Sequence, residues 1–179
     1  LMRDLGKTQQ AFFPDKHCHA SILDGLAQQR NEVRRFPHNK SDFLEKYLLN
    51  CSISKQKHTA IIVTEGVFSM SGDMGDLPKL SQHAMTYNAP LIVEDSHGIG
   101  VLGAHGAGTP NHLKSKTHVM TGSLGKALAS HGGFIAGPDS LIDDLIQSAR
   151  PLIYSTAMAP ASAAAALTSL HVLYDEPQH

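Results

Sequence analysis

Two kinds of hydrophobic pattern alternate along this chain. Continuous apolar runs at 59–64 and 89–93 are typical of strands buried on both faces of a parallel sheet. Between and around them, helices are predicted over 19–29, 77–87 and 138–149. Because strands and helices alternate, we expect an α/β fold with a mostly parallel sheet, flanked by helices and joined by right-handed crossovers.

Weaker signals complete this order. Ser41 is expected to cap a helix whose inner face carries Phe43, Leu44, Tyr47 and Leu48. The remaining elements are expected as strands at 33–36, 117–121 and 131–136, a turn at 12–15, a loop at 154–156 and a helix after Pro160. Residues 1–13 show no strand of their own, and no repeat or internal boundary divides the chain.

Composition excludes several classes of function. The formal net charge is -1 and 17% of residues are charged, which speaks against binding to nucleic acid or to an anionic membrane. The apolar stretch 157–173 is interrupted by polar residues and indicates a helix of a soluble protein. With no signal peptide and two cysteines expected to stay reduced, the protein is expected to be cytoplasmic. His17-Cys18-His19 is the one His/Cys cluster, and no later pair completes a zinc site.

Lys126 carries the strongest chemical signal in the sequence. It follows the predicted strand through a short Gly/Ser turn, Thr121-Gly-Ser-Leu-Gly-Lys126, which places an amine at a strand end. A phosphate-binding loop would need Gly where Met120 stands and a hydroxyl where Ala127 stands. A lysine in such a position can be desolvated and made nucleophilic towards an aldehyde.

Other polar residues lie at the same edge of the predicted sheet. Glu94 and His97 follow one buried strand, Ser69 follows the neighbouring strand, and Ser123 precedes the lysine. Ligands of open α/β sheets bind at the carboxyl ends of the strands. Each residue alone could be structural, as a turn former, a loop histidine or a solvated carboxylate. Together with Lys126 and His19, they describe a site for an aromatic aldehyde phosphate.

Three motifs also resemble a known family. Residues 64–73 (TEGVFSMSGD), 93–103 (VEDSHGIGVLG) and 122–126 (GSLGK) resemble, in order and spacing, the α-oxoamine synthases. This resemblance implies the large domain of a fold-type-I enzyme that depends on pyridoxal 5'-phosphate (PLP). Within the family, 19–21, 34–39 and 153–160 look most like the 8-amino-7-oxononanoate synthase branch. The branches making 5-aminolevulinate, 2-amino-3-ketobutyrate or 3-ketosphinganine remain alternatives.

The resemblance implies a role for each site residue. Lys126 would hold PLP as a Schiff base and move the substrate's α-proton, and Glu94 would pair with the pyridine nitrogen. His97 and Ser69 would contact the phenolic oxygen of the ring, and His19 would stack on its face. The residues implied to be catalytic are therefore Lys126, His97 and His19.

The phosphate and the substrates are assigned in the same way. Ser123 would bind the phosphate, and Ser155 with Thr156 would reach the phosphate of the neighbouring subunit, so a homodimer with shared sites is implied. The reaction would condense L-alanine with a pimeloyl thioester, carried by coenzyme A or an acyl carrier protein, and release carbon dioxide.

Two features depart from the family's pattern. Glu94 stands where the family has Asp, one methylene shorter. Family members are also about twice as long, so residues 1–179 are expected to be the central part of the large domain, without an amino-terminal segment and a carboxy-terminal small domain. We therefore expect this span alone to be inactive. A catalytically silent partner subunit is a competing hypothesis; it is weakened by Lys126, which silent partners lose. An unrelated α/β binding protein is a third.

Overall fold

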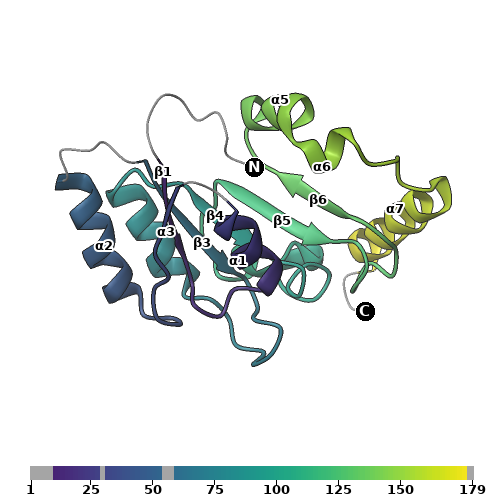
Figure 1. Ribbon diagram of the computed structural model, residues 1–179. Helices are drawn as coiled ribbons and strands as arrows, with labels where there is room; N and C mark the ends of the chain where they lie inside the picture. The colour runs from purple at the N-terminus through teal and green to yellow at the C-terminus, as the bar shows by residue number, and fades with distance from the viewer. Residues whose placement is uncertain (1–9, 29–30, 54–58, 177–179) are drawn as a thin grey trace.

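A six-stranded sheet forms the centre of the computed structural model, which describes residues 10–28, 31–53 and 59–176 (Figure 1). The strands follow the order β2-β1-β3-β4-β5-β6, and all neighbours are parallel except β5 and β6. Their bounds are β1 (Gln10–Pro14), β2 (Glu32–Val33), β3 (Thr59–Glu65), β4 (Leu91–Glu94), β5 (Val119–Ser123) and β6 (Gly133–Ala136). The expected mostly parallel α/β sheet is confirmed.

Helices cover both faces of the sheet. The helices are α1 (Ala20–Ala27), α2 (Ser41–Ile53), α3 (Leu77–Thr86), α4 (Thr109–His112), α5 (Asp139–Ser148), α6 (Arg150–Ile153) and α7 (Pro160–Asp175), with a 3-10 turn η1 (Ala104–Gly106). One core cluster joins the sheet to α2 and α3 through Leu44, Leu48, Leu77 and Leu80. The other cluster lies on the opposite face, where Ile22 and Leu26 of α1 and Leu141 of α5 pack.

The first strand corrects an expectation from the sequence. Residues 12–15 were expected to form a turn and 1–13 no strand, but β1 lies between β2 and β3 with all five residues buried. Phe13 packs into one core cluster and Phe12 into the other. Pro14 stands at the strand's last position. Burial of two aromatic rings outweighs the turn signal of the proline.

Smaller differences concern the edges of the fold. The strand expected at 33–36 is reduced to β2, with Phe36 joined to Asp15 by an isolated bridge. On α2, Leu44 and Leu48 are buried as expected, whereas Phe43 is 47% exposed. The sequence did not predict the short helix α6.

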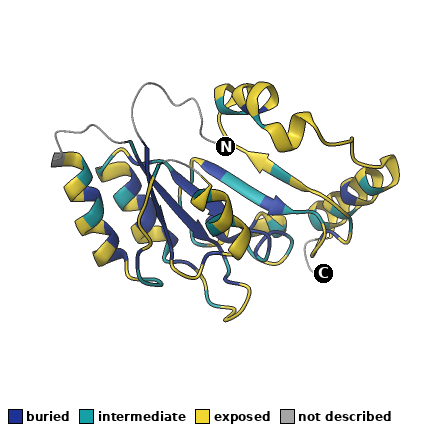
Figure 2. Cartoon of the chain, viewed as in Figure 1, coloured by how far each residue is buried: buried dark blue, intermediate teal, exposed yellow. Residues whose placement is uncertain are grey.

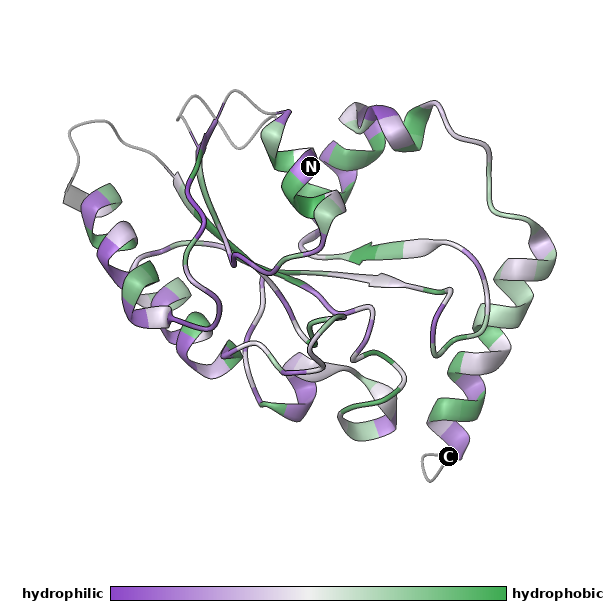
Figure 3. Ribbon diagram, turned by 60° about the horizontal axis from the view of Figure 1, so that its bottom comes forward, coloured by the Kyte–Doolittle hydropathy of each residue, from purple (hydrophilic) through white to green (hydrophobic). Residues whose placement is uncertain are grey.

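Burial is uneven across the molecule (Figure 2). Strands β1, β3 and β4 are almost wholly buried, whereas β6 and the helices α5–α7 are mostly exposed. Leu167, Leu170, Val172 and Tyr174 are exposed apolar residues on α7, where Figure 3 shows green segments along the helix. Among the described residues, no helix is long and apolar enough to cross a bilayer.

Candidate functional site

Three strands end together at one edge of the sheet. In the parallel register, Glu65 of β3 pairs with Glu94 of β4, and Glu94 pairs with Thr121 of β5. Side chains two residues apart on a strand share a face. The residues two positions earlier, Val63, Ile92 and Val119, all belong to the core cluster beneath α1 and α5. The register therefore places the Glu65, Glu94 and Thr121 side chains on the α1 side of the sheet.

This edge brings together the chemistry that the sequence indicated. Glu65, Glu94 and His97 each offer one donor atom within 4.8 Å of the others. Lys126 Nζ lies 3.4 Å from His97 Nδ1. The structure therefore brings Lys126, His97 and Glu94 into one cluster from two different strand ends.

Glu65 is a member of this cluster that sequence reasoning did not single out. Its side chain is 1% exposed, and Oε1 accepts a hydrogen bond from the His19 N–H at 2.5 Å. Oε2 is buried and has no hydrogen-bond partner among the described residues. Burial raises the pKa of Glu65; the His19 hydrogen bond opposes this and the charge of Glu94 adds to it. Its position at the end of β3, equivalent to Glu94 on β4, was the signal available in the sequence.

Glu94 and Asp95 are adjacent in sequence but have different environments. Glu94 is partly exposed, and its Oε1 accepts hydrogen bonds from the N–H and hydroxyl of Ser96. Asp95 is fully buried and accepts bonds from the Thr109 N–H (2.7 Å) and hydroxyl (2.6 Å). Its surroundings are close-packed, because a Cβ at any of three glycines would collide with Asp95: Gly66, Gly98 and Gly108. Glu94 is thus the carboxylate open to the cluster, and Asp95 ties the surrounding loops together.

The electrostatics favour a neutral His97. Partial burial and then the positive charge of Lys126 lower the pKa of His97, and Glu94 opposes them. A neutral imidazole can accept a hydrogen bond from the Lys126 amine at Nδ1. The pair is therefore suited to exchanging a proton with a ligand placed above it.

The remaining candidates lie in three other segments of the chain. His19 is the N-cap of α1, where Nδ1 accepts from the Ser21 N–H, and its backbone N–H reaches Glu65. Ser69 is exposed in the loop after β3, and Ser123 Oγ accepts from the Gly125 N–H at 3.0 Å.

Ser155 and Thr156 make no described hydrogen bond to the residues named above. Both are exposed between α6 and α7. The Ser155 hydroxyl donates to the Leu152 carbonyl at 3.0 Å. Among the described residues, no hydrogen bond joins either residue to the Glu65–Glu94–His97 cluster.

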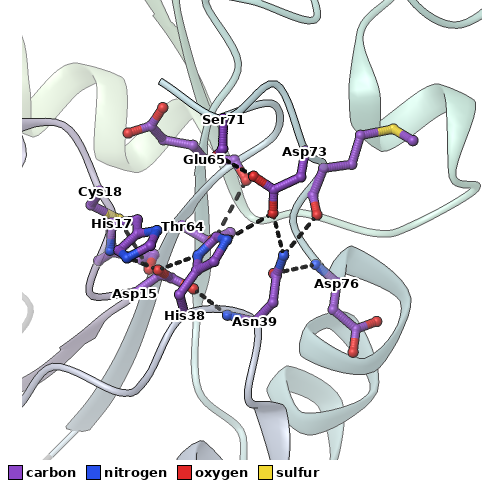
Figure 4. A network of polar contacts seen from close by, with 12 residues as sticks. Asp15, His17, Cys18, His38, Asn39, Thr64, Glu65, Ser71, Asp73 and Asp76 are labelled. Atoms are coloured by element: carbon purple, nitrogen blue, oxygen red, sulfur yellow. Dashed lines mark hydrogen bonds and ion pairs between the residues drawn. The ribbon is translucent and has the colours of Figure 1, made fainter. Parts of the chain in front are cut away.

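A polar network adjoins the site on the side of β1 (Figure 4). His38 Nδ1 lies 3.0 Å from Asp15 Oδ1, and Nε2 lies 2.7 Å from Asp73 Oδ2. Asn39 donates its backbone N–H to Asp15 and its side-chain amide to Asp73, both at 2.9 Å. Burial opposes protonation of His38, but hydrogen bonds to Asp15 and Asp73 outweigh it and raise its pKa. We call Asp15, His38, Asn39 and Asp73 the His38 network.

The His17-Cys18-His19 cluster is not arranged around a common centre. The Cys18 thiol is buried and lies 3.8 Å from the Val63 carbonyl, and burial raises its pKa. His17 instead stacks on His38, with ring centroids 4.1 Å apart. Zinc binding needs a thiolate, which this environment disfavours.

Comparisons with known proteins show the family to which the chain belongs. Residues 2–176 match the family described as aminotransferase class I and II. The chain is 45% identical to a putative 8-amino-7-oxononanoate synthase of Desulforudis audaxviator, covering 97% of this chain and 44% of that protein. It is 41% identical to a serine palmitoyltransferase of Sphingobacterium spiritivorum, covering 92% and 41% respectively. The chain thus spans less than half the length of these relatives.

Solved structures show the same architecture. A serine palmitoyltransferase variant from S. paucimobilis with a bound PLP–myriocin aldimine is 28% identical, with a TM-score of 0.85 over 95% of this chain and 44% of that one. An 8-amino-7-oxononanoate synthase from Francisella tularensis is 33% identical, with a TM-score of 0.77 over 96% of this chain and 50% of that one.

Proposed function

Because the chain belongs to the aminotransferase class I and II family, we propose that it is the catalytic core of a PLP-dependent 8-amino-7-oxononanoate synthase. The enzyme would join L-alanine to a pimeloyl thioester, with loss of carbon dioxide, in biotin synthesis. The observation that carries the proposal is the meeting of Lys126, His97 and Glu94 at the carboxyl ends of β4 and β5. Relatives named for this activity, at 45% and 44% identity, support it.

The residues of the site fit PLP. The buried Oε2 of Glu65 lacks a hydrogen-bond partner within residues 10–28, 31–53 and 59–176, and Glu65 lies in a cluster with a second carboxylate. Two close carboxylates are stabilised by a group that brings a proton and positive charge, and a pyridinium nitrogen does so. An amine for the aldehyde and an imidazole for the phenolic oxygen are 3.4 Å apart. Ser123, at the end of β5, offers a hydroxyl for the phosphate three residues before the lysine.

Each residue would then have a definite task. When bound, PLP supplies an electron sink for the carbanion formed at the substrate's α-carbon. The Glu94 carboxylate would keep the proton on the pyridine nitrogen through a charge-assisted hydrogen bond. Lys126 Nζ would hold the cofactor and remove and return the α-proton, and neutral His97 would hydrogen-bond the phenolic oxygen with Ser69. His19, fixed to Glu65 through its backbone, would cover the ring.

A serine palmitoyltransferase activity is the second candidate. It is favoured by a relative that is 41% identical over 92% of this chain, nearly as similar as the first. Both reactions use the same proton transfers at the amino acid's α-carbon, so the residues described above do not separate them. The substrates do, because one pair is L-alanine with a C7 acyl group and the other is L-serine with a C16 acyl group.

Ser155 and Thr156 are proposed to complete the phosphate site of a second subunit. They are exposed, and among the hydrogen bonds of the described residues none joins them to the cluster of their own chain. A homodimer with shared sites would use them, and cofactor affinity would then follow dimer formation. Sedimentation of the full-length protein with and without PLP measures dimer formation and its dependence on the cofactor.

The proposed function is tested on the full-length protein. We expect PLP to give the wild type and Lys116→Ala the absorbance band of a Schiff base, at longer wavelength than that of the free aldehyde, since Lys116 is exposed and outside the cluster. Lys126→Ala should lack this Schiff-base band even where it holds PLP as the aldehyde. Mass spectrometry should then detect 8-amino-7-oxononanoate from L-alanine and pimeloyl-CoA. Formation of 3-ketosphinganine from L-serine and palmitoyl-CoA instead would favour the second candidate. Failure of the wild type to bind PLP would overturn both.

A further inference from the structure

We propose that His38 is a positioning residue, which in its doubly protonated form holds together the two loops that carry His19 and Ser69. This inference rests on the proposed function, because those two residues are assigned to the cofactor. His38 itself lies outside the cluster and acts through Asp15 and Asp73 (Figure 4).

The contacts of His38 define its protonation. Each ring nitrogen faces a carboxylate oxygen, at 3.0 Å on the Asp15 side and 2.7 Å on the Asp73 side. A neutral imidazole has one N–H and one lone pair, so it could donate to only one of these oxygens and would repel the other. Only the imidazolium donates to both. His17, stacked on the ring, is the third titratable group that faces it, and Phe68 meets it edge-on.

Asp15 connects His38 to the segment that carries His19. Asp15 directly follows β1, is 1% exposed and accepts the His17 N–H at 2.8 Å. Its carbonyl accepts the Cys18 N–H at 3.1 Å. These bonds form the turn that leads into His19, the N-cap of α1. The position of Asp15 therefore sets where His19 enters the site.

Asp73 connects His38 to the loop that carries Ser69. Residues 66–75 fold back on themselves, with bonds from the Phe68 N–H to the Asp73 carbonyl and from the Gly75 N–H to the Gly66 carbonyl, both 2.9 Å. Asn39 adds bonds to the Asp73 carboxylate and to the Met74 carbonyl. Ser69 lies at the exposed end of this loop, so the loop's position relative to β1 determines where its hydroxyl can reach.

Loss of the His38 proton should therefore loosen both loops together. The pKa of His38 is raised, so its contribution is complete below about 6.5, the ordinary histidine value, and is lost as the pH rises through the raised value. The effect on PLP should be an affinity that falls at alkaline pH. Because charge-assisted hydrogen bonds are among the strong ones, we expect a change of about tenfold.

The test compares His38→Gln with His112→Gln in the full-length protein. His112 is exposed at the end of α4 and serves as the matched control. PLP affinity is measured by absorbance titration at pH 6.5 and 8.5. We expect His38→Gln to bind about tenfold more weakly than the control at pH 6.5 and nearly equally at pH 8.5. An equal ratio at both pH values would overturn the proposal, because a merely structural loss does not depend on this proton.

Two further measurements keep the proposal open to refutation. In Asp73→Asn, which retains His38, the loss of affinity should occur at lower pH than in the wild type; an unchanged profile would contradict the proposal. Hydrogen exchange of the cofactor-free protein at pH 6.5 should be faster in residues 66–75 of His38→Gln than of the control. This result does not depend on PLP, so it tests the positioning role even if the proposed function fails, and unchanged exchange would overturn it.

Discussion

Glu65 and Glu94 are paired across two neighbouring parallel strands, and both carboxylates end at the same edge of the sheet. In the part of the chain that the structure describes, one oxygen of the buried Glu65 has no hydrogen-bond donor. Such an arrangement is unfavourable in the free protein, and a ligand that supplies a proton and positive charge relieves it.

Glu65→Gln should therefore separate stability from binding. The pKa of Glu65 is raised, so this group destabilises the fold at neutral pH, and stability from this site increases as the pH falls through the raised value. The amide keeps an acceptor for the His19 N–H and removes the charge. We expect the cofactor-free protein to melt a few degrees higher and to bind PLP more weakly. Glu45→Gln, an exposed change on α2, should alter neither; a lower melting temperature for Glu65→Gln would contradict the argument.

Glu94→Gln should impair catalysis and leave stability unchanged, whereas Asp95→Asn should mainly lower stability. Asp95 is fully buried and accepts two bonds from Thr109. An amide there can accept only the Thr109 N–H, so the buried Thr109 hydroxyl loses the acceptor of its proton, which should cost about 1–3 kcal/mol. Glu94→Gln should leave the melting temperature nearly unchanged. With PLP bound, however, it should slow exchange of the alanine α-proton, followed by NMR in deuterium oxide, far more than Asp95→Asn does. If Asp95→Asn stays folded and exchanges the α-proton more slowly than Glu94→Gln, then Asp95 and not Glu94 is the partner of the pyridine nitrogen.

Lys126 should be the site of covalent attachment. Its amine lies 3.4 Å from His97 Nδ1. No other lysine in the described residues has a hydrogen bond to His97. Borohydride reduction of the PLP-loaded protein, followed by peptide mapping, should place the pyridoxyl group on the peptide containing Lys126. A label on a different lysine would remove the basis of the proposed site.

The strand β1 should be essential to the fold. Phe13 is 1% exposed in the larger core cluster, so Phe13→Ala should destabilise the protein by about 3–5 kcal/mol. Phe43→Ala, at a position 47% exposed on α2, should cost much less. Denaturant unfolding of the full-length protein measures both. Equal losses would mean that β1 does not carry the core as described.

The sequence predicted the buried strands and the polar residues that follow them, because a continuous apolar run is a local signal. It did not predict β1, since Phe12-Phe13-Pro14 is short and contains a turn-forming residue, and only two flanking strands reveal its burial. The pairing of Glu65 with Glu94 depends on strand register, and the His38 network joins residues 35 positions apart. Neither relationship has a local signal. The resemblance to a family supplied the remaining assignments.

The packing around Asp95 also limits how this protein can diversify. Gly66, Gly98 and Gly108 lie in three separate loops. A side chain at any of them would collide with the buried carboxylate of Asp95 unless that loop moved away. Gly108 also has a positive φ of 95°, which disfavours every other residue. Single substitutions at these three glycines should therefore disrupt the packing around Asp95. Variation that tunes the site must enter at exposed loop positions such as Met70 and Val101, which are 97% and 67% exposed.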